Sequence, residues 1–464
     1  MANINGTPES DNLSGTAEGD FIIAGAGNDA VFGGAGNDEI HGEDGDDTLF
    51  GQAGDDQLYG ESGNDLLRGD GGNDELFGGD GNDNLRGGAG IDSFDGGSNT
   101  EEDNQLSTYG DRISFYEGGA TQGVVADLRT GIISNDGFGN VENMVGIESL
   151  GSDTAFVDTF YGNDGRNAFL ANKGDYLYGF GGDDDFYITS AAALVDGGDG
   201  VDRLDLGSSG GWLMPDSDGN GFAEVAAAAT SGWIVDLSTG YVEDGYGNVG
   251  SVAGIENVGG SGLGDTLVGD DNANTLSGGT GDDVLIGLGG DDLLEGGSGH
   301  DYLEGNAGND SLQGGDDDDY LYGNAGDDLL NGGNGFDRVG YSAGATTGVT
   351  VDLNIVGVAQ DTGSQGWDTL IGVEHVSGTR FNDVLTGDGG DNWLWGGSNG
   401  SGITGDDIIS AGAGNDLVDV GNGNHQLDGG SGIDTLGLDG NGTDITVAGV
   451  TVSLALQGAG QDTE

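Results

Sequence analysis

The amino-acid sequence predicts an all-β protein, a parallel β-solenoid in which short repeats stack as successive coils. Three observations predict this fold. Residues 6–95 divide without a gap into ten nine-residue units. Every one of these units has aspartate at its sixth position and an apolar residue at its eighth position. Glycine supplies 106 of the 464 residues, whereas proline supplies only two. A repeat with a fixed period is the usual signature of a solenoid.

The single apolar residue in each nine-residue unit limits the secondary structure that the unit can form. An amphipathic helix needs three or four apolar residues in every two turns, so a helix is excluded. A strand of about three residues can instead direct one side chain inward. Glycines at positions one, two and four then permit positive φ angles in the turn before that strand. We therefore expect stacked units to pair their strands into parallel sheets and to align their turns.

Aspartate at position six recurs in two long arrays and in two degenerate ones. The array at residues 1–95 contains Asp11, Asp20, Asp29, Asp38, Asp47, Asp56, Asp65, Asp74, Asp83 and Asp92. The array at residues 260–340 contains Asp265, Asn274, Asp283, Asp292, Asp301, Asp310, Asp319, Asp328 and Asp337. The degenerate arrays, at residues 158–205 and 381–437, contain Asp158, Asn167, Asp175, Asp184 and Asp202, and Asp383, Asn392, Asp407, Asp416, His425 and Asp434. We expect asparagine at position six, and histidine even more, to weaken a metal site.

The formal net charge of −75, from 84 acidic and nine basic residues, indicates a bound cation. Such self-repulsion opposes a compact state, and a multivalent cation would neutralise it. Aspartate carboxylates and turn carbonyls are hard oxygen ligands that suit Ca²⁺. Nucleic acid is excluded as a partner because phosphate binding needs a basic surface. The chain has no cysteine, so neither a disulfide nor a thiolate ligand contributes.

The unit GGAGNDEIH at residues 33–41 carries a family resemblance. It resembles the RTX, or haemolysin-type calcium-binding, repeat, whose consensus is G-G-x-G-x-D-x-U-x with U apolar. The resemblance implies a right-handed parallel β-roll, in which two units complete one coil and calcium lies between loops one coil apart. It also implies roughly 15–20 calcium ions per chain, most with six or seven oxygen ligands. By that resemblance the ligand pairs include Asp29 with Asp47, Asp38 with Asp56, and Asp283 with Asp301.

Two groups of residues depart from the repeat. Glu9 and Glu18 stand where glycine belongs at position four of the first two units, and we interpret these units as a capping turn with weaker calcium sites. Asp216, Asp218 and Asn220 match positions 1, 3 and 5 of an EF-hand loop, but Ala227 occupies position 12. Because the bidentate carboxylate is missing there, a calcium loop and a plain acidic turn are equally open readings.

Three spacer modules, at residues 96–157, 206–259 and 341–380, separate the arrays. The shared outline starts from an Asp-Arg pair, which lies within the first spacer and just before the second and third. It continues with a valine-rich strand and a Gly/Asp-rich hairpin, and it ends with a strand containing Ile-Glu or Val-Glu. We interpret them as metal-poor solenoid turns with a protruding hairpin. Residues 438–464 resemble the start of a fourth spacer, because the segment from Val450 aligns without gaps to the segment from Val349. We therefore expect the native protein to be longer.

No motif in the sequence indicates catalysis. None of the four histidines lies in an H-E-x-x-H motif, and the G-x-S-x-G match at residues 207–211 is expected by chance in so glycine-rich a chain. Trp367, Trp393 and Trp395 suit either sugar stacking or packing within the solenoid, and we favour packing. The sequence therefore predicts that this chain is not an enzyme.

The expected function is that of a secreted structural repeat protein that folds on binding calcium outside the cell. We expect export by a type I apparatus, because the N-terminus lacks an apolar leader. We also expect no membrane span, because no window approaches 18 apolar residues. Two alternatives stay open. One is a calcium-dependent fibre, surface-layer or adhesin component that contacts other copies or cell-surface polysaccharide. The other is the non-catalytic accessory region of a larger secreted enzyme or toxin.

Overall fold

The regular structure of the protein consists of β-strands and one 3-10 helix, η1 (Gly363–Gln365), among the described residues. The structure is a computed structural model that describes residues 2–98, 110–115, 120–152, 154–191, 194–207, 231–397, 405–420, 423, 425–437 and, for the backbone, 451–453. The chain divides into two compact units, one formed by residues 1–230 and 240–255 and the other by residues 231–239 and 256–464. The all-β prediction is confirmed.

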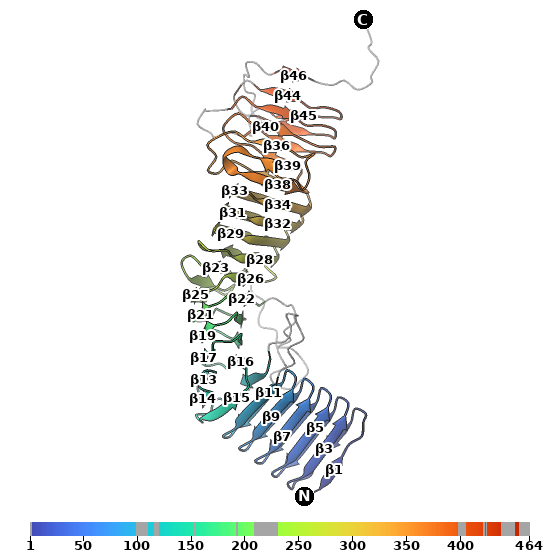
Figure 1. The fold of residues 1–464 in the computed structure, drawn as a ribbon, viewed down its shortest axis with the longest axis vertical. Helices are drawn as coiled ribbons and strands as arrows, with labels where there is room; N and C mark the ends of the chain where they lie inside the picture. The colour runs from blue at the N-terminus through green and yellow to red at the C-terminus, as the bar shows by residue number, and fades with distance from the viewer. Residues whose placement is uncertain are drawn as a thin grey trace. The chain divides into compact units, whose positions relative to one another are not determined.

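The first array forms two parallel sheets, one from odd-numbered strands and one from even-numbered strands. In the odd sheet, Ile22 lies opposite Ile40; in the even sheet, Val31 lies opposite Leu49. Each strand thus pairs with the strand 18 residues later, so two nine-residue units complete one coil, and Figure 1 shows the strands stacked as rungs. The strands are β1 (Asn3–Asn5), β2 (Asn12–Ser14), β3 (Phe21–Ala26), β4 (Ala30–Ala35), β5 (Glu39–Asp44), β6 (Thr48–Ala53), β7 (Gln57–Ser62), β8 (Leu66–Gly71), β9 (Glu75–Asp80), β10 (Asn84–Ala89) and β11 (Ser93–Ser98).

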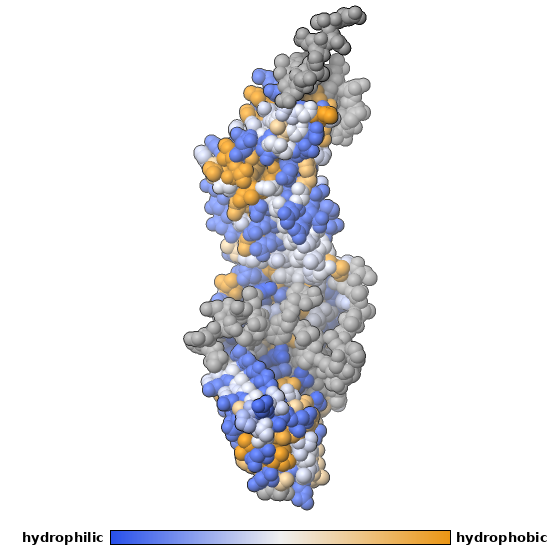
Figure 2. Space-filling model, turned by 90° about the vertical axis from the view of Figure 1, so that its right-hand side faces the viewer, coloured by the Kyte–Doolittle hydropathy of each residue, from blue (hydrophilic) through white to orange (hydrophobic). Residues whose placement is uncertain are grey.

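The core of the arrays is a double row of position-eight side chains. Every one from Ile22 to Leu85 has an exposed fraction of 0%, and so has every one from Leu267 to Val339. Aromatic side chains at position nine stack outside this core, with ring centroids 4.9 Å apart for Phe32 and Phe50. Figure 2 shows hydrophobic residues gathered in separate patches among hydrophilic residues on the face that it presents.

Beyond the first array, the same unit contains a spacer and the short degenerate array. In the spacer, β13, β14 and β15 form an antiparallel meander, which includes the expected hairpin. Parallel stacking resumes where β15 pairs with β11 and β16 pairs with β12. The strands are β12 (Arg112–Phe115), β13 (Val124–Asp127), β14 (Ile132–Asp136), β15 (Glu142–Val145), β16 (Ser149–Ser152), β17 (Thr159–Tyr161), β18 (Ala168–Ala171), β19 (Tyr176–Gly181), β20 (Asp185–Ile188), β21 (Leu194–Asp199), β22 (Arg203–Leu206), β24 (Tyr241–Glu243) and β25 (Val249–Ala253).

The second compact unit repeats this plan. Leu285 lies opposite Leu303 in parallel strands, and the short antiparallel pair of β37 and β38 marks the third spacer. The strands are β23 (Ile234–Asp236), β26 (Asn257–Gly259), β27 (Thr266–Val268), β28 (Thr275–Thr280), β29 (Val284–Gly289), β30 (Leu293–Ser298), β31 (Tyr302–Ala307), β32 (Ser311–Asp316), β33 (Tyr320–Ala325), β34 (Leu329–Asn334), β35 (Arg338–Gly340), β36 (Thr350–Asp352), β37 (Gln360–Asp361), β38 (Trp367–Ile371), β39 (His375–Ser377), β40 (Val384–Thr386), β41 (Trp393–Trp395), β42 (Ile408–Ser410), β43 (Leu417–Asp419), β44 (Gln426–Asp428), β45 (Thr435–Gly437) and β46 (Thr451–Ser453).

Candidate metal sites

A ladder of position-six aspartates follows the stacking of the coils. The backbone N–H of Asp29 donates a hydrogen bond to Oδ1 of Asp47 at 2.8 Å, and the N–H of Asp47 donates to Oδ1 of Asp65 at 2.7 Å. Asp38 donates in the same way to Asp56 at 2.7 Å. All five side chains are at most 3% exposed. The structure therefore places aspartates 18 residues apart next to each other and holds one oxygen of each carboxylate in a fixed position.

The second carboxylate oxygen, Oδ2, of the interior aspartates is buried and accepts no hydrogen bond from the described residues. Burying a charged group without a partner costs several kcal/mol, so these oxygens require a compensating cation or proton. The aspartates with this property are Asp29, Asp38, Asp47, Asp56, Asp65, Asp74, Asp83, Asp92, Asp111, Asp184, Asp283, Asp292, Asp301, Asp310, Asp319, Asp328, Asp337 and Asp416.

A glycine leaves a space beside most of these oxygens, whereas Ala24 and Ala411 stand at position one of the units that contain Asp29 and Asp416. At Gly33, a Cβ atom would lie 2.5 Å from Oδ2 of Asp38 and 2.8 Å from the carbonyl oxygen of Gly51 in the next coil. A carboxylate oxygen and a backbone carbonyl oxygen therefore face the same small space. Calcium is bound in proteins by this combination of donors, so the residues fit the ion that the sequence predicts.

Burial raises the pKa of the ladder aspartates. It raises the pKa of Asp65 and of Asp83 to about 7, and that of Asp47 to about 6. The pKa of Asp283 and of Asp319 in the second array is likewise raised to about 7 by burial. Without a cation these carboxyl groups retain protons close to neutral pH, and a bound cation would displace the protons.

The aspartates of the first units of both long arrays differ because a hydroxyl group occupies position two. Oδ2 of Asp20 accepts hydrogen bonds from the N–H and the hydroxyl of Thr16, each at 2.7 Å. Thr7 bonds Asp11 in the same way, and Ser261 bonds Asp265 through both its N–H and its hydroxyl. These carboxylates already have protein donors, which gives a physical reason for weaker calcium binding there. Sequence reasoning considered Glu9 and Glu18 and missed this signal at position two.

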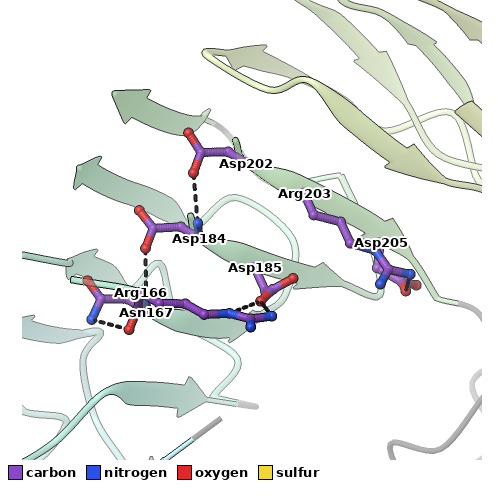
Figure 3. Close-up of polar contacts among 7 residues, drawn as sticks. All are labelled: Arg166, Asn167, Asp184, Asp185, Asp202, Arg203 and Asp205. Atoms are coloured by element: carbon purple, nitrogen blue, oxygen red, sulfur yellow. Dashed lines mark hydrogen bonds and ion pairs between the residues drawn. The ribbon is translucent and has the colours of Figure 1, made fainter. Parts of the chain in front are cut away.

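The short degenerate array continues the ladder with an amide at one position. Figure 3 shows Asn167, Asp184 and Asp202 one above another: the N–H of Asn167 donates to Oδ1 of Asp184 at 2.7 Å, and that of Asp184 donates to Oδ1 of Asp202 at 2.8 Å. Beside this ladder, Arg166 forms an ion pair with Asp185 at 2.6 Å. Asn167 preserves the stacking but supplies no negative charge.

The last array contains a histidine within its ladder. The N–H of Asp383 donates to Oδ1 of Asp407 at 3.0 Å, and the N–H of Asp407 meets Nδ1 of His425 at 3.2 Å. The side chains of Asp407 and His425 are both 1% exposed. In the other row of this array, the N–H of Asp416 donates to Oδ1 of Asp434 at 3.2 Å. An imidazole in this position replaces a hard oxygen donor by a nitrogen.

Two further predicted features have different outcomes. Asp216, Asp218 and Asn220 of the EF-hand-like loop lie outside the described residues. Trp393 stacks on His375 of the preceding coil, with ring centroids 4.2 Å apart, which agrees with packing within the solenoid, whereas Trp367 is 54% exposed. In the part of the chain that the structure describes, no three His, Asp or Glu side chains gather as a metal cluster. The candidate sites depend instead on backbone carbonyls together with the aspartate rows.

The fold is a β-solenoid of stacked short strands. Its buried carboxylates face backbone carbonyls of the next coil, so the class is one that can bind hard cations between coils. The family model described as RTX calcium-binding nonapeptide repeat (4 copies) matches residues 5–40, 32–67, 41–76, 77–100, 260–303, 304–339, 368–399 and 401–436, together more than half of the chain. The chain belongs to this family and is a calcium-binding β-roll protein.

Other comparisons give more distant likenesses. No curated protein matches the chain. Among solved structures, the extracellular lipase LipA from Serratia marcescens is 22% identical with a TM-score of 0.17, and the match covers 50% of this chain and 42% of the lipase chain. Within the described residues, no helix is long and apolar enough to cross a membrane.

Proposed function

We propose that this chain is a secreted structural repeat protein whose coils fold when calcium binds between them outside the cell. The observation that carries the proposal is the row of buried Oδ2 atoms that lack a hydrogen-bond donor among the described residues. Most of these oxygens face a space lined by glycine, and at Gly33 that space is also bordered by a backbone carbonyl. Calcium would supply the partner that the protein does not.

The energetics of one repeat support coupling between folding and calcium binding. Burying a leucine side chain contributes about 2 kcal/mol, whereas fixing the backbone of nine residues costs about 1–2 kcal/mol each. The net charge of −75 adds repulsion to this balance. Because an unfolded chain has no preformed site, the free energy of ion binding becomes free energy of folding.

The interior position-six aspartates are the proposed ligands, each serving the ions on both sides of its loop. Asp11, Asp20 and Asp265, which have hydroxyl donors, would hold calcium less tightly. Sites on exposed turns are expected to have Kd values on the order of 10⁻⁴–10⁻³ M, as in extracellular modules. Such sites would leave the chain unfolded in a low-calcium cytosol, which suits export by a type I apparatus before folding. RTX proteins are typically secreted by bacteria, which supports this location.

A calcium titration of the full chain, followed by far-UV circular dichroism, tests the proposal. We expect β-structure to appear between micromolar and millimolar calcium and roughly 15–20 ions to bind. Magnesium at the same concentration is the control, because its smaller octahedral shell suits these carbonyl-rich spaces poorly. Equal β-structure in excess chelator would contradict calcium-coupled folding. The repeat-only architecture fits a non-catalytic region, so the assay needs no substrate.

A further inference from the structure

A Gly-x-Glu tripeptide recurs toward the end of each of the three spacers between arrays. It comprises residues 146–148, 254–256 and 372–374. In the first and third spacers this tripeptide lies beside the aspartate of the Asp-Arg pair, Asp111 and Asp337 respectively. In an array, the neighbour at that place would be the loop one coil later, 18 residues along the chain.

The glycine of the first tripeptide supplies the carbonyl oxygen that, within an array, comes from the loop one coil later. In the array, the space at Gly33 is bordered by an aspartate Oδ2 and by the carbonyl of Gly51. The space at Gly96 is bordered instead by Oδ2 of Asp111, 2.6 Å from where a Cβ would lie, and by the carbonyl of Gly146. The same two kinds of oxygen therefore meet at the edge of the spacer.

The third spacer repeats this arrangement in the other compact unit. At Gly332, a Cβ would lie 2.5 Å from Oδ2 of Asp337, and the neighbouring carbonyl belongs to Gly372. Two segments far apart in the sequence thus form the same local structure. Because the arrangement occurs in two spacers, it indicates a shared function rather than a coincidence in one loop.

The glutamate of the tripeptide takes the place of the next aspartate in the ladder. The N–H of Asp111 donates to Oε2 of Glu148 at 2.9 Å, and the N–H of Asp337 donates to Oε2 of Glu374 at 3.0 Å. In return, the N–H groups of Glu148 and Glu374 donate to the carbonyl oxygens of Asp111 and Asp337, at 3.0 and 3.2 Å. Both pairs are 37 residues apart.

A shorter loop explains why glutamate replaces aspartate here. Four residues lie between Gly51 and Asp56 in the array, but only one lies between Gly146 and Glu148. The longer side chain of glutamate reaches the N–H of Asp111 from this shorter loop. Gly146 and Gly372 have φ angles of 62° and 57°, a left-handed conformation that glycine adopts without strain.

In each pair, the Oδ2 atom of the aspartate indicates a bound ligand. Asp111 and Asp337 are 0% exposed, and their Oδ2 atoms accept no hydrogen bond from any described residue. We propose that Gly146–Glu148 and Gly372–Glu374 each complete a calcium site with Asp111 and Asp337. The tripeptide thereby replaces a whole nine-residue loop, and the spacers carry calcium at their edges. This inference rests on the proposed calcium-bound state of the arrays.

Native mass spectrometry of the full chain in calcium tests the assignment by counting bound ions. The Glu148→Gln/Glu374→Gln variant is expected to bind about two ions fewer than the wild type. Glutamine still accepts the hydrogen bond from the aspartate N–H, so the coils are retained. A Glu148→Asp/Glu374→Asp variant keeps both charges but shortens the side chains, and it should lose the same ions. The control is Glu43→Gln/Glu75→Gln, which removes two charges at exposed positions of the first array.

Hydrogen exchange in calcium gives the second readout. Residues 110–115 and 146–152 should lose calcium-dependent protection in the Glu148 variants, whereas residues 20–80 should retain it. An unchanged ion count in both Glu148/Glu374 variants would overturn the inference, as would an equal loss in the Glu43/Glu75 control. If the wild type binds no calcium, the proposed function itself fails, and that outcome is distinct from unchanged counts in a calcium-bound wild type.

Discussion

The backbone N–H of Asp47 donates a hydrogen bond to Oδ1 of Asp65 at 2.7 Å, although 18 residues separate them. This bond orients the carboxylate of Asp65 and leaves its Oδ2 buried without a donor among the described residues. Each carboxylate of the ladder therefore has two roles. Its Oδ1 stabilises the stacking of coils, and its Oδ2 is held in position for a cation. The following predictions depend on this division.

Replacing Asp47 should remove about two calcium ions, because its carboxylate lies between those of Asp29 and Asp65 in the ladder. The Asp47→Ala variant can be compared with wild type by isothermal calorimetry and native mass spectrometry. Asp46→Ala is the matched control, since it removes the same charge from the exposed neighbouring residue. Loss of the same number of ions from both variants would argue against the ladder as the binding element.

Replacing Gly33 by alanine should destabilise the calcium-bound protein by about 1–3 kcal/mol, the usual cost of overpacking. Its Cβ would lie 2.5 Å from Oδ2 of Asp38 and would occupy the proposed ion space. Gly71→Ala is the control, because a Cβ there meets only the carbonyl of Gln52 at 3.8 Å. Thermal unfolding in millimolar calcium should separate the two variants, and equal melting temperatures would contradict this geometry.

Acidification should favour folding when calcium is absent. Burial raises the pKa of Asp65, Asp83 and Asp283 in the folded protein to about 7, above the value of about 3.9 for an unfolded chain. The folded state therefore binds more protons, so this stabilisation is complete below about pH 4 and is lost as pH rises through about 7. Circular dichroism of metal-free protein should show more β-structure at pH 5 than at pH 8.

Calcium should reverse that dependence on pH. Ion binding requires deprotonated carboxylates and so releases protons, which makes calcium affinity rise between pH 5 and 8. Titrations in buffers of different ionisation enthalpy would measure the released protons. A calcium affinity that does not change over this range would contradict the raised pKa values.

Removing the hydroxyl of Thr379 should weaken folding without changing the ion count. This buried side chain donates to Oδ1 of Asp383 at 2.9 Å, and its N–H donates to Oδ2 at 2.8 Å. The Thr379→Val variant should lose about 1–2 kcal/mol of stability, because it removes the hydroxyl hydrogen bond to Asp383 and the acceptor of the Phe381 N–H. Thr386→Val on β40 is the control. Chemical denaturation measures stability, and a lower ion count would show that this unit uses calcium like the array interior.

Replacing His425 by aspartate should add calcium binding to the last array. His425 occupies position six, where its Nδ1 faces the N–H of Asp407 at 3.2 Å. Aspartate would restore an oxygen donor and a negative charge in the ladder. The His425→Asp variant should bind about one more ion than wild type, with His425→Asn as the control that lacks the charge. Equal counts for both variants would show that the geometry here does not suit an ion.

The sequence by itself determined the strands, the turns and the aspartate rows, because the nine-residue repeat is regular. A nine-residue period with one inward-facing apolar side chain admits a short strand and a turn, and little else. The 18-residue pairing of Ile22 with Ile40 agrees with the two-unit coil that the family resemblance implied. The aspartate rows were likewise expected, because every unit places its carboxylate at the same point of the turn.

Only the tertiary structure decided which carboxylate oxygens accept hydrogen bonds and which spacer residues follow the last aspartate of each row. Thr16 and Asp20 belong to one unit, but the contrast with Asp38 emerges only from hydrogen bonds that the sequence does not state. Glu148 lies 37 residues from Asp111, which is not a multiple of nine, because an antiparallel meander intervenes. Regular units stack by a repeated local rule, whereas the spacers rejoin the solenoid through contacts that depend on how the whole coil closes.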